Sequence, residues 1–267
     1  MPFIKPMLAS PLPANFQPGP SFVAEEKYDG HRLILEVQGS NVRAWSRDEL
    51  PRVLPQHVRS DAARLPNGVY DGELISLEKT KSYGVTELSQ ADKLCFVVFD
   101  ILEVAGRSTR DQSYIDRRSL ILAAFENLIA LTGVTYAAST PVATMEHIST
   151  LAKRVWARGG EGLIIKDVQA AYVPGKRSKS WLKIKQCHTA VLKVIGYAAG
   201  RLGPFSTVVL EDGQGNKTTV KTLNTQEREN LGRRPLHFVG KKLRIEYQER
   251  TPDGSYRHPM WDRWEDA

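Results

Sequence analysis

The sequence predicts an α+β protein in two parts, a larger part of strands and helices followed by a small β-domain. Most apolar runs before Gln186 are short and β-prone, which favours strands. Two longer segments in the same region have the apolar spacing of helices. From Ala190 on, short β-prone runs alternate with glycine-rich turns, a pattern typical of a closed or nearly closed β-domain. We therefore expect domains over residues 1–187 and 188–267.

The elements of the larger part begin with strands. A proline-rich opening to Pro20 is expected to run extended across the surface. Five β-prone runs follow it: Ser21–Ala24, Arg32–Val37, Val42–Trp45, Val69–Leu77 and Leu94–Leu102. Gly39-Ser40-Asn41 predicts a hairpin turn between the second and third of these strands. The last run, LCFVVFDIL, is continuously apolar and predicts a strand buried on both faces.

Two helices and two more strands complete this part. Tyr114–Ala130 has apolar residues at i, i+4 spacing, and Ser113 can cap its first turn. Glu146–Arg158 predicts the second helix, which the following pair of glycines ends. The segments after it are a strand, a basic loop and a strand: Gly162–Lys166, Tyr172–Lys179 and Ser180–Lys185. After the boundary, the β-prone runs are VLKVIGY, STVVLE, KTTVKTL and KKLRIEY.

Charge and cysteine content limit the class of function. The chain has 267 residues, with 37 Lys and Arg against 30 Asp and Glu, and this net charge of +7 fits a polyanionic partner. Cys95 and Cys187 form no CxxC pair, which excludes a zinc ribbon and a disulfide framework. No apolar run is as long as a signal-peptide core or a membrane span, so a cytoplasmic protein without a membrane partner is expected.

The strongest chemical signal is the string EEKYDGHR, from Glu25 to Arg32. Its K-x-D-G core alone also fits an ordinary turn, and chance supplies such a string in roughly one chain in twenty. Five further strings follow it in order: SRDEL at Ser46–Leu50, DGEL at Asp71–Leu74, VVFDIL at Val97–Leu102, EGLIIK at Glu161–Lys166 and SWLKIK at Ser180–Lys185. This ordered series favours a functional site over a turn.

Together these strings resemble the ordered motifs of the covalent nucleotidyltransferases, which include DNA ligases, RNA ligases and mRNA capping enzymes. The resemblance runs from Met7 to about Lys185, and the forms KYDG, EGLIIK and PGKRSxxWLKIK resemble ATP-dependent DNA ligases. It implies a nucleotidyltransferase (adenylation) domain of antiparallel sheets with flanking helices, followed by an OB-fold β-barrel. The ending YRHPMWDRWED resembles a degenerate form of the family's C-terminal motif, which usually ends in Asp-Lys.

The resemblance implies that Lys27 carries AMP taken from ATP. A lysine amine attacks phosphorus only as the free base, and with a pKa of about 10.4 only about one in a few thousand is free at pH 7. Burial, nearby cations or a metal would have to lower that pKa. The implied nucleotide-binding residues are Glu25, Arg32, Arg47, Glu73, Phe99, Lys183 and Lys185. The implied ligands of Mg²⁺ or Mn²⁺ are Glu73 and Glu161, since carboxylate oxygens are donors that Mg²⁺ prefers.

Several of these residues have structural alternatives. Arg47 could be an ordinary surface cation rather than a contact to the ribose or the nick. Phe99 could fill the core rather than stack on adenine. Glu25 could be a solvated strand residue rather than the group that reads adenine. Trp181 could pack under the site or simply fill the core.

The implied partner is nicked double-stranded DNA, bound by a monomer. Candidate phosphate-binding residues are Lys176, Arg177 and Lys179 in the basic loop, and Arg201, Lys241 and Lys242 in the β-domain. A merely solubilising surface is the alternative for each of them.

Other activities would share part of this pattern. An RNA ligase or a capping enzyme would share the covalent lysine, and a capping enzyme would use GTP. An NAD⁺-dependent ligase is expected to carry an additional domain before the lysine, and 26 residues are too few for it. A non-catalytic OB-fold module with a decayed transferase domain would be expected to lose at least one motif residue, yet all are present: Lys27, Glu73, Glu161, Lys183 and Lys185.

Overall fold

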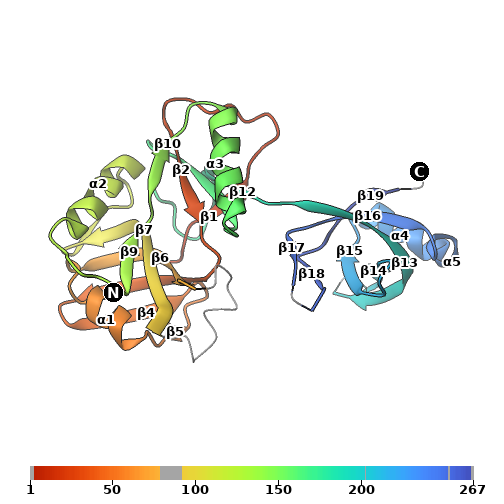
Figure 1. Cartoon of the computed structure of the whole chain (residues 1–267), viewed down its shortest axis with the longest axis horizontal. Coiled ribbons are helices and arrows are strands. Elements are labelled where there is room, and N and C mark those ends of the chain that lie inside the picture. The colour runs from red at the N-terminus through yellow and green to blue at the C-terminus, as the bar shows by residue number, and fades with distance from the viewer. Residues whose placement is uncertain (1–2, 79–91, 202, 252, 266–267) are drawn as a thin grey trace. The chain divides into compact units, whose positions relative to one another are not determined.

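The chain divides into two compact units, Met1–Ile184 and Lys185–Ala267 (Figure 1). The structure, a computed structural model, describes residues 3–78, 92–201, 203–251 and 253–265. Both units are rich in strands with a few flanking helices, so the predicted α+β class is confirmed.

The first sheet of unit 1 carries the lysine of the K-x-D-G string. Its strand order is β1-β12-β11-β2-β10, and β2 pairs antiparallel with both of its neighbours. β1 runs parallel to β12. The strands are β1 Leu8–Pro11, β2 Phe22–Lys27, β10 Ser139–Pro141, β11 Gly162–Asp167 and β12 Arg177–Lys185.

The second sheet of unit 1 is mainly antiparallel, in the order β5-β4-β3-β6-β7-β8, with β9 parallel to β7. The two-residue turn Gly39-Ser40 joins β3 to β4, with a positive φ at the glycine, as predicted for a tight hairpin. The strands are β3 His31–Gln38, β4 Asn41–Ser46, β5 Pro51–Arg52, β6 Gly68–Ser76, β7 Leu94–Val104, β8 Arg107–Ser108 and β9 Val134–Tyr136.

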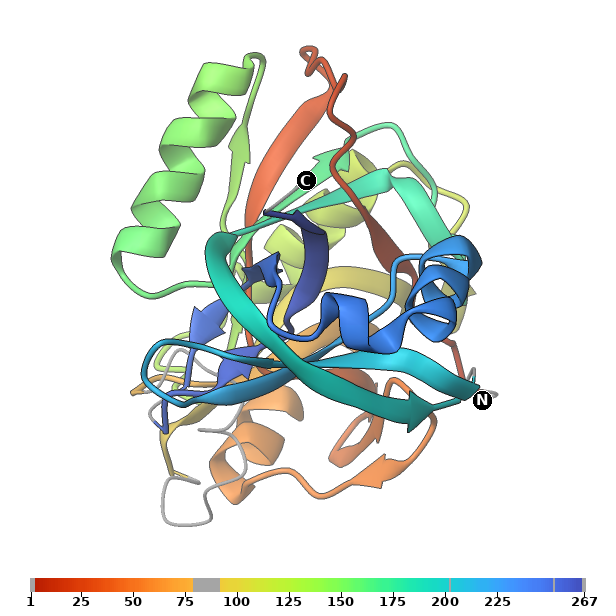
Figure 2. The ribbon, with the colours of Figure 1, turned by 90° about the vertical axis from the view of Figure 1, so that its right-hand side faces the viewer.

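Strand alternation arranges unit 1 in four layers. Leu33 and Leu35 of β3 point to a core shared with α1 Gln56–Ala62 and α2 Tyr114–Phe125. Ile34, between them, points to the opposite core, which includes Trp181 of β12. The outer face of the first sheet packs against α3 Met145–Ala157, which lies beside β2 and β10 in Figures 1 and 2. The inner faces of the two sheets therefore meet each other, and the motif residues lie between them.

Unit 2 is a curled sheet around a single core. The strand order is β15-β14-β13-β16-β19, and the end strands β15 and β19 contact each other. Alternate residues of the central strands, together with Leu231 of α4, fill the core. The elements are β13 His188–Gly200, β14 Gly203–Glu211, β15 Lys217–Lys221, α4 Thr225–Arg233, α5 Pro235–Phe238, β16 Lys242–Tyr247, β17 Glu249–Arg250, β18 Tyr256–Arg257 and β19 Met260–Trp264.

The structure corrects several local predictions. The first predicted helix ends at Phe125 rather than Ala130, because Leu128 donates its backbone N–H to Phe125 in a turn and Ala130 has a positive φ. The predicted basic loop is shorter, because pairing with β1 starts β12 at Arg177. The opening segment is not wholly on the surface, since Met7 is fully buried.

Some elements had no counterpart in the sequence prediction. α1 was missed, and so were α4 and α5, which interrupt a domain expected to consist of strands. Among the helices that the structure describes, none is long and apolar enough to cross a membrane.

Candidate functional site

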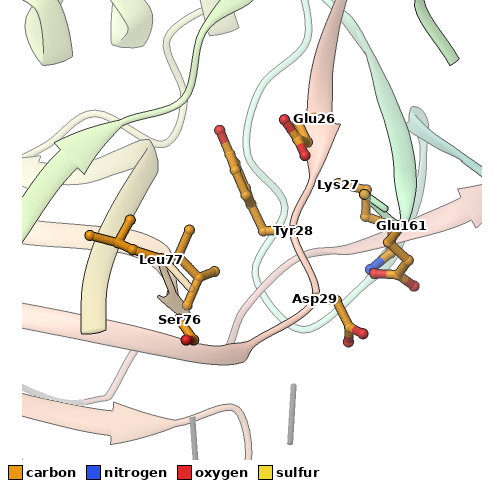
Figure 3. A pocket seen from close by; sticks show the side chains of 9 residues that line it. Glu26, Lys27, Tyr28, Asp29, Ser76, Leu77 and Glu161 are labelled. Atoms are coloured by element: carbon orange, nitrogen blue, oxygen red, sulfur yellow. The ribbon is translucent and has the colours of Figure 1, made fainter. Parts of the chain in front are cut away.

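Lys27 and Glu161 form an ion pair at the end of the first sheet. Lys27 is the last residue of β2, and Glu161 directly precedes β11, whose Gly162 pairs with Lys27 in the ladder. The Lys27 Nζ lies 2.5 Å from Glu161 Oε2 (Figure 3). The preceding Gly160 permits this turn, since a Cβ there would lie 2.5 Å from Val155 Cγ1. The structure thus brings together two motif residues that are 134 positions apart.

A pocket of about 140 Å³ adjoins this pair. In Figure 3 the Tyr28 side chain points away from Glu161. Burial, with the nearby Glu26 carboxylate, raises the pKa of the Tyr28 hydroxyl well above its usual range, so that it stays protonated. The pocket lining comprises Glu26, Lys27, Tyr28, Asp29, Ile75, Ser76, Leu77, Gly160 and Glu161.

Arg32 is held firmly on the inner face of the second sheet. Its guanidinium makes two hydrogen bonds of 2.6 Å to the fully buried Asp71, and a third of 3.1 Å to the carbonyl of Met7. Tyr172 donates to the same Asp71 carboxylate at 2.6 Å and accepts from the Met7 N–H at 2.8 Å. Burial alone would lower the pKa of Arg32, but the Asp71 carboxylate outweighs it and raises that pKa. The N-terminal segment is therefore part of the scaffold of the site.

Glu73 lies opposite Arg32 in the β3–β6 ladder, on the same inner face. Burial raises its pKa to about 7, although Arg32 and Lys27 both lower it. The turn of the K-x-D-G string lies close to this strand, since a Cβ on Gly30 would be 2.2 Å from the Leu74 carbonyl and 3.0 Å from Glu73 Cγ. A side chain at Gly30 would therefore displace β6 at the position of Glu73.

Wild-type protein should lose stability as the pH rises toward neutral, and Glu73→Gln should make this loss smaller. Between pH 4.5 and about 7 the unfolded carboxylate is ionised while the folded one keeps its proton, so wild-type stability falls as the pH rises through this window. Glutamine does not titrate, so the difference in unfolding free energy between pH 5 and pH 8 should shrink by about 1–3 kcal/mol. Urea unfolding measures this difference, with the exposed Glu126→Gln as control. An unchanged difference would show that folded Glu73 is ionised at neutral pH.

Glu25 is buried, so the alternative of a solvated glutamate is wrong. Its Oε2 lies 2.7 Å from the ammonium of Lys166, which also donates to the Phe99 carbonyl at 2.9 Å. Tyr114 donates to the other carboxylate oxygen, Oε1. Burial raises the pKa of Glu25 and lowers that of Lys166, while each charge opposes this effect on its partner. The pair is thus a polar floor between the sheets.

Aromatic rings surround the two buried cations. Trp181 is 2% exposed and lies 4.3 Å from the Lys166 ammonium and 5.7 Å from the Arg32 guanidinium, ring centroid to charge. It therefore packs beneath the site. Phe99 is only partly buried, with Arg32 4.6 Å above its ring and its edge against Trp181. Phe99 both contributes to the core and leaves part of its ring accessible.

The remaining predicted cations differ in placement. Lys183 and Lys185 alternate with Ile184 on β12 and lie on the same face as Trp181, toward the second sheet. Arg47 lies in the turn after β4, with 61% of its side chain exposed and Asp48 at 3.7 Å. The structure therefore places Lys183 and Lys185 on the inner face, whereas Arg47 lies at the surface.

The predicted phosphate-binding residues are largely at the surface. Lys176, Arg177 and Lys179 are exposed, and Arg177 donates to the Ala9 carbonyl at 2.5 Å. In unit 2, Arg201 and Lys242 are exposed, while the Lys241 ammonium lies 3.0 Å from His237 Nε2.

Sequence reasoning missed three groups behind the site: Lys166, Tyr114 and the fully buried pair of Arg117 with Asp100. Lys166 and Asp100 belong to the EGLIIK and VVFDIL strings, so their position in those strings was the available signal. Nothing in the pattern of the predicted helix distinguishes Arg117 as a buried residue.

Two carboxylates could hold a divalent cation. Among the residues that the structure describes, no three His, Cys, Asp or Glu side chains gather into a metal site. Glu161 nevertheless lies close enough to Glu73 to raise the pKa of that carboxyl, with Lys27 beside both. Such a donor set fits Mg²⁺, which commonly uses one or two carboxylates together with substrate phosphates and water.

Residues 6–185 match the family model described as "ATP dependent DNA ligase domain". The chain is 28% identical to the multifunctional non-homologous end joining protein LigD of Mycolicibacterium smegmatis over 96% of this chain and 37% of that protein. It is 32% identical to a probable DNA ligase of Streptomyces griseus, over 72% of this chain and 41% of that protein. The chain thus spans about two fifths of the length of these curated relatives.

Solved structures show the same fold. The chain resembles a Lig E DNA ligase with a TM-score of 0.78 at 20% identity, over 97% of this chain and 98% of that one. It also resembles the ligase domain of LigD from M. tuberculosis, with a TM-score of 0.59 at 25% identity, over 98% and 95% of the two chains. The predicted order of an adenylation-type domain and an OB-fold is confirmed by these matches.

Proposed function

This chain belongs to the ATP-dependent DNA ligase family, and we propose that it seals nicks in duplex DNA through AMP held covalently on Lys27. The observation that carries the proposal is the placement of Lys27 at the end of β2. Its amine pairs with Glu161, while Glu25 and Lys166 form the buried floor two residues away on the same strand face.

In the first step, the Lys27 amine would attack the α-phosphorus of ATP. A nitrogen–phosphorus bond forms, the bond to pyrophosphate breaks, and the amine loses its proton. The ion pair with Glu161 holds the amine in place before the reaction, and it must be released when the nitrogen loses its charge. AMP would then pass to the 5′-phosphate at the nick, and the 3′-hydroxyl would displace it as the strand is joined.

Recognition of the base would use the floor between the sheets. Glu25 would accept a hydrogen bond from the exocyclic amine of adenine, and the accessible part of the Phe99 ring would stack on the base. Arg32, Lys183 and Lys185 would face the sugar and phosphates, because they lie on the inner faces of the two sheets. For Arg47, exposure supports a contact to DNA rather than one to the buried floor.

Glu73 and Glu161 would hold Mg²⁺ or Mn²⁺ through their carboxylate oxygens. When bound, such an ion would offset the charge that develops on the leaving pyrophosphate. The protein's part is to hold the two carboxylates, one within β6 and one directly before β11, beside Lys27.

The two units would divide the work between nucleotide chemistry and DNA contact. We expect an adenylation domain over residues 1–187 and an OB-fold domain over 188–267, acting as a cytoplasmic monomer on nicked double-stranded DNA. The exposed cations of both units support this expectation, because backbone phosphates are bound by Lys and Arg.

Labelling tests the proposal directly. The whole chain would be incubated with Mg²⁺ and ATP or GTP, each labelled at the α-phosphate, and then separated by denaturing electrophoresis and mapped by peptide. ATP should label Lys27, and the labelled chain should then seal nicked duplex DNA. Label from GTP alone, or sealing of nicked RNA but not DNA, would contradict the proposal.

Replacing Lys176, Arg177 and Lys179 together by serine should weaken the salt dependence of nick binding. Each neutralised phosphate contributes about −0.9 to the slope of log K against log salt, so the slope should flatten by up to about 2.7. Fluorescence anisotropy with nicked duplex at several salt concentrations measures the slope. A control variant would replace three exposed cations of α1 and α3: Arg59, Lys153 and Arg154. Equal flattening in both variants would show a general effect of net charge.

A further inference from the structure

The first turn of α2 places a phenol directly behind Glu25. Ser113 caps the helix by accepting from the Asp116 N–H, and Ile115 donates its N–H to the Val168 carbonyl at 2.9 Å, just beyond β11. Tyr114, between them, is fully buried. The turn is therefore fastened to the first sheet at the strand that carries Lys166.

The Tyr114 ring is fixed by two cations. The Lys166 ammonium lies 4.5 Å and the Arg117 guanidinium 5.7 Å from the ring centroid. Arg117 is in turn held by Asp100 at 2.7 and 3.0 Å. The hydroxyl of Tyr114 donates to Glu25 Oε1. Glu25 therefore receives Tyr114 on one oxygen and Lys166 on the other.

We propose that Tyr114 is a positioning residue that holds the Glu25 carboxylate aimed at the base, so that the first turn of α2 sets the nucleotide preference. The inference rests on the proposed function, in which Glu25 reads adenine. Tyr114 itself need not touch the nucleotide.

The charge of Glu25 decides which base it accepts. An ionised carboxylate only accepts hydrogen bonds, so it suits the 6-amino group of adenine and repels the 6-oxygen of guanine. A protonated carboxyl can donate a hydrogen bond to the 6-oxygen of guanine, so the advantage for adenine is lost. Burial favours the protonated form of Glu25, whereas Lys166 and Arg118 favour the ionised form. A hydroxyl that donates to the carboxylate also favours the ionised form.

Tyr114→Phe removes this hydroxyl and keeps the ring. The substrates would be ATP, purine riboside triphosphate, which lacks the 6-amino group, and GTP, each labelled at the α-phosphate. Labelling of Lys27 in the full chain gives kcat/KM for each. The preference for ATP over purine riboside triphosphate should fall about tenfold, mainly through a higher KM for ATP, because a hydrogen bond to a charged group is lost. The ratio of kcat/KM for ATP to kcat/KM for GTP should fall as well.

The pH profile provides a second readout. The charged and titratable groups around Glu25 are Lys166 on β11, Asp100 on β7, and Tyr114 and Arg118 on α2. When the preference for ATP is plotted against pH, it should fall on the acid side. Loss of the Tyr114 hydroxyl should move this acid limb to higher pH, because it raises the pKa of Glu25 further. A purely structural role would lower labelling by all three nucleotides equally and leave this limb in place.

Tyr172→Phe is the matched control, because it removes another buried hydroxyl, one that donates to Asp71 instead. It should leave the ratio of ATP to purine riboside triphosphate unchanged. In a chain that already carries Glu25→Gln, Tyr114→Phe should have no further effect on that ratio. If Tyr114→Phe does not fold, Glu25→Gln alone should reproduce the lost preference.

The outcomes separate the two proposals. If wild-type chain is not labelled by ATP, the proposed function fails. If the wild-type chain is labelled, the function stands. The role of Tyr114 is then overturned if Tyr114→Phe keeps the wild-type ratio of ATP to purine riboside triphosphate, or if it changes that ratio equally in the Glu25→Gln background.

Discussion

Lys27→Ala should abolish labelling of the chain by ATP and reduce sealing of nicked duplex by at least about a thousandfold, the loss typical of a removed nucleophile. No other amine should replace it, because Lys166 is buried in its pair with Glu25, and Lys183 and Lys185 lie on a different strand. Electrophoresis after incubation with labelled ATP measures the first effect, and a nicked-duplex assay measures the second.

A substrate that already carries AMP on its 5′-phosphate provides the control. Lys27→Ala should still join this nick, because the strand-joining step does not use the amine as a nucleophile. The variant should also fold normally, since the Lys27 side chain lies at a strand end and is 24% exposed. Label on another lysine, or failure on both substrates with an intact fold, would overturn the assignment.

Glu161→Ala should slow both adenylylation and sealing, by about a hundredfold at low Mg²⁺. The substitution removes one of two carboxylates proposed to hold the cation and also the partner of the Lys27 ammonium. A Mg²⁺ titration should therefore show a higher requirement for the metal in both reactions.

Glu26→Ala is the matched control for this prediction. Glu26 lies in the same pocket but on the opposite face of β2 from Lys27, where it pairs with Arg158. Its loss should leave the Mg²⁺ requirement unchanged. Wild-type rates for Glu161→Ala across the titration would remove Glu161 from the set of metal ligands.

Ordered motifs were enough to predict which strands build the site. The predicted strand Ser21–Ala24 ends before Glu25, whereas β2 extends to Lys27. With a strand period of two, Lys27 then shares a face with Glu25, and Trp181 shares one with Lys183. The structure has both arrangements, on the inner face of the first sheet. The family resemblance supplied the roles, and the roles of individual residues stay predictions.

Other features depend on pairing between distant segments and were not predictable from local patterns. Lys166 ends an apolar run, as many surface lysines do, yet it is buried because Glu25 lies on the neighbouring strand. The basic loop became the start of β12 because the opening segment pairs with it. α4 was missed because it is strongly polar, and of its side chains only Leu231 is buried.

The contacts of the site also constrain how the chain can fold during synthesis. Met7 bonds to Tyr172 across 165 positions, and Lys27 meets Glu161 across 134. Contacts of such long range slow folding, because a large loop must close before they stabilise anything. A nascent chain exposes Lys27 early, but its partner leaves the ribosome only after more than a hundred further residues. Lys27, the proposed nucleophile, is therefore made first, and its pocket closes only when unit 1 is almost complete.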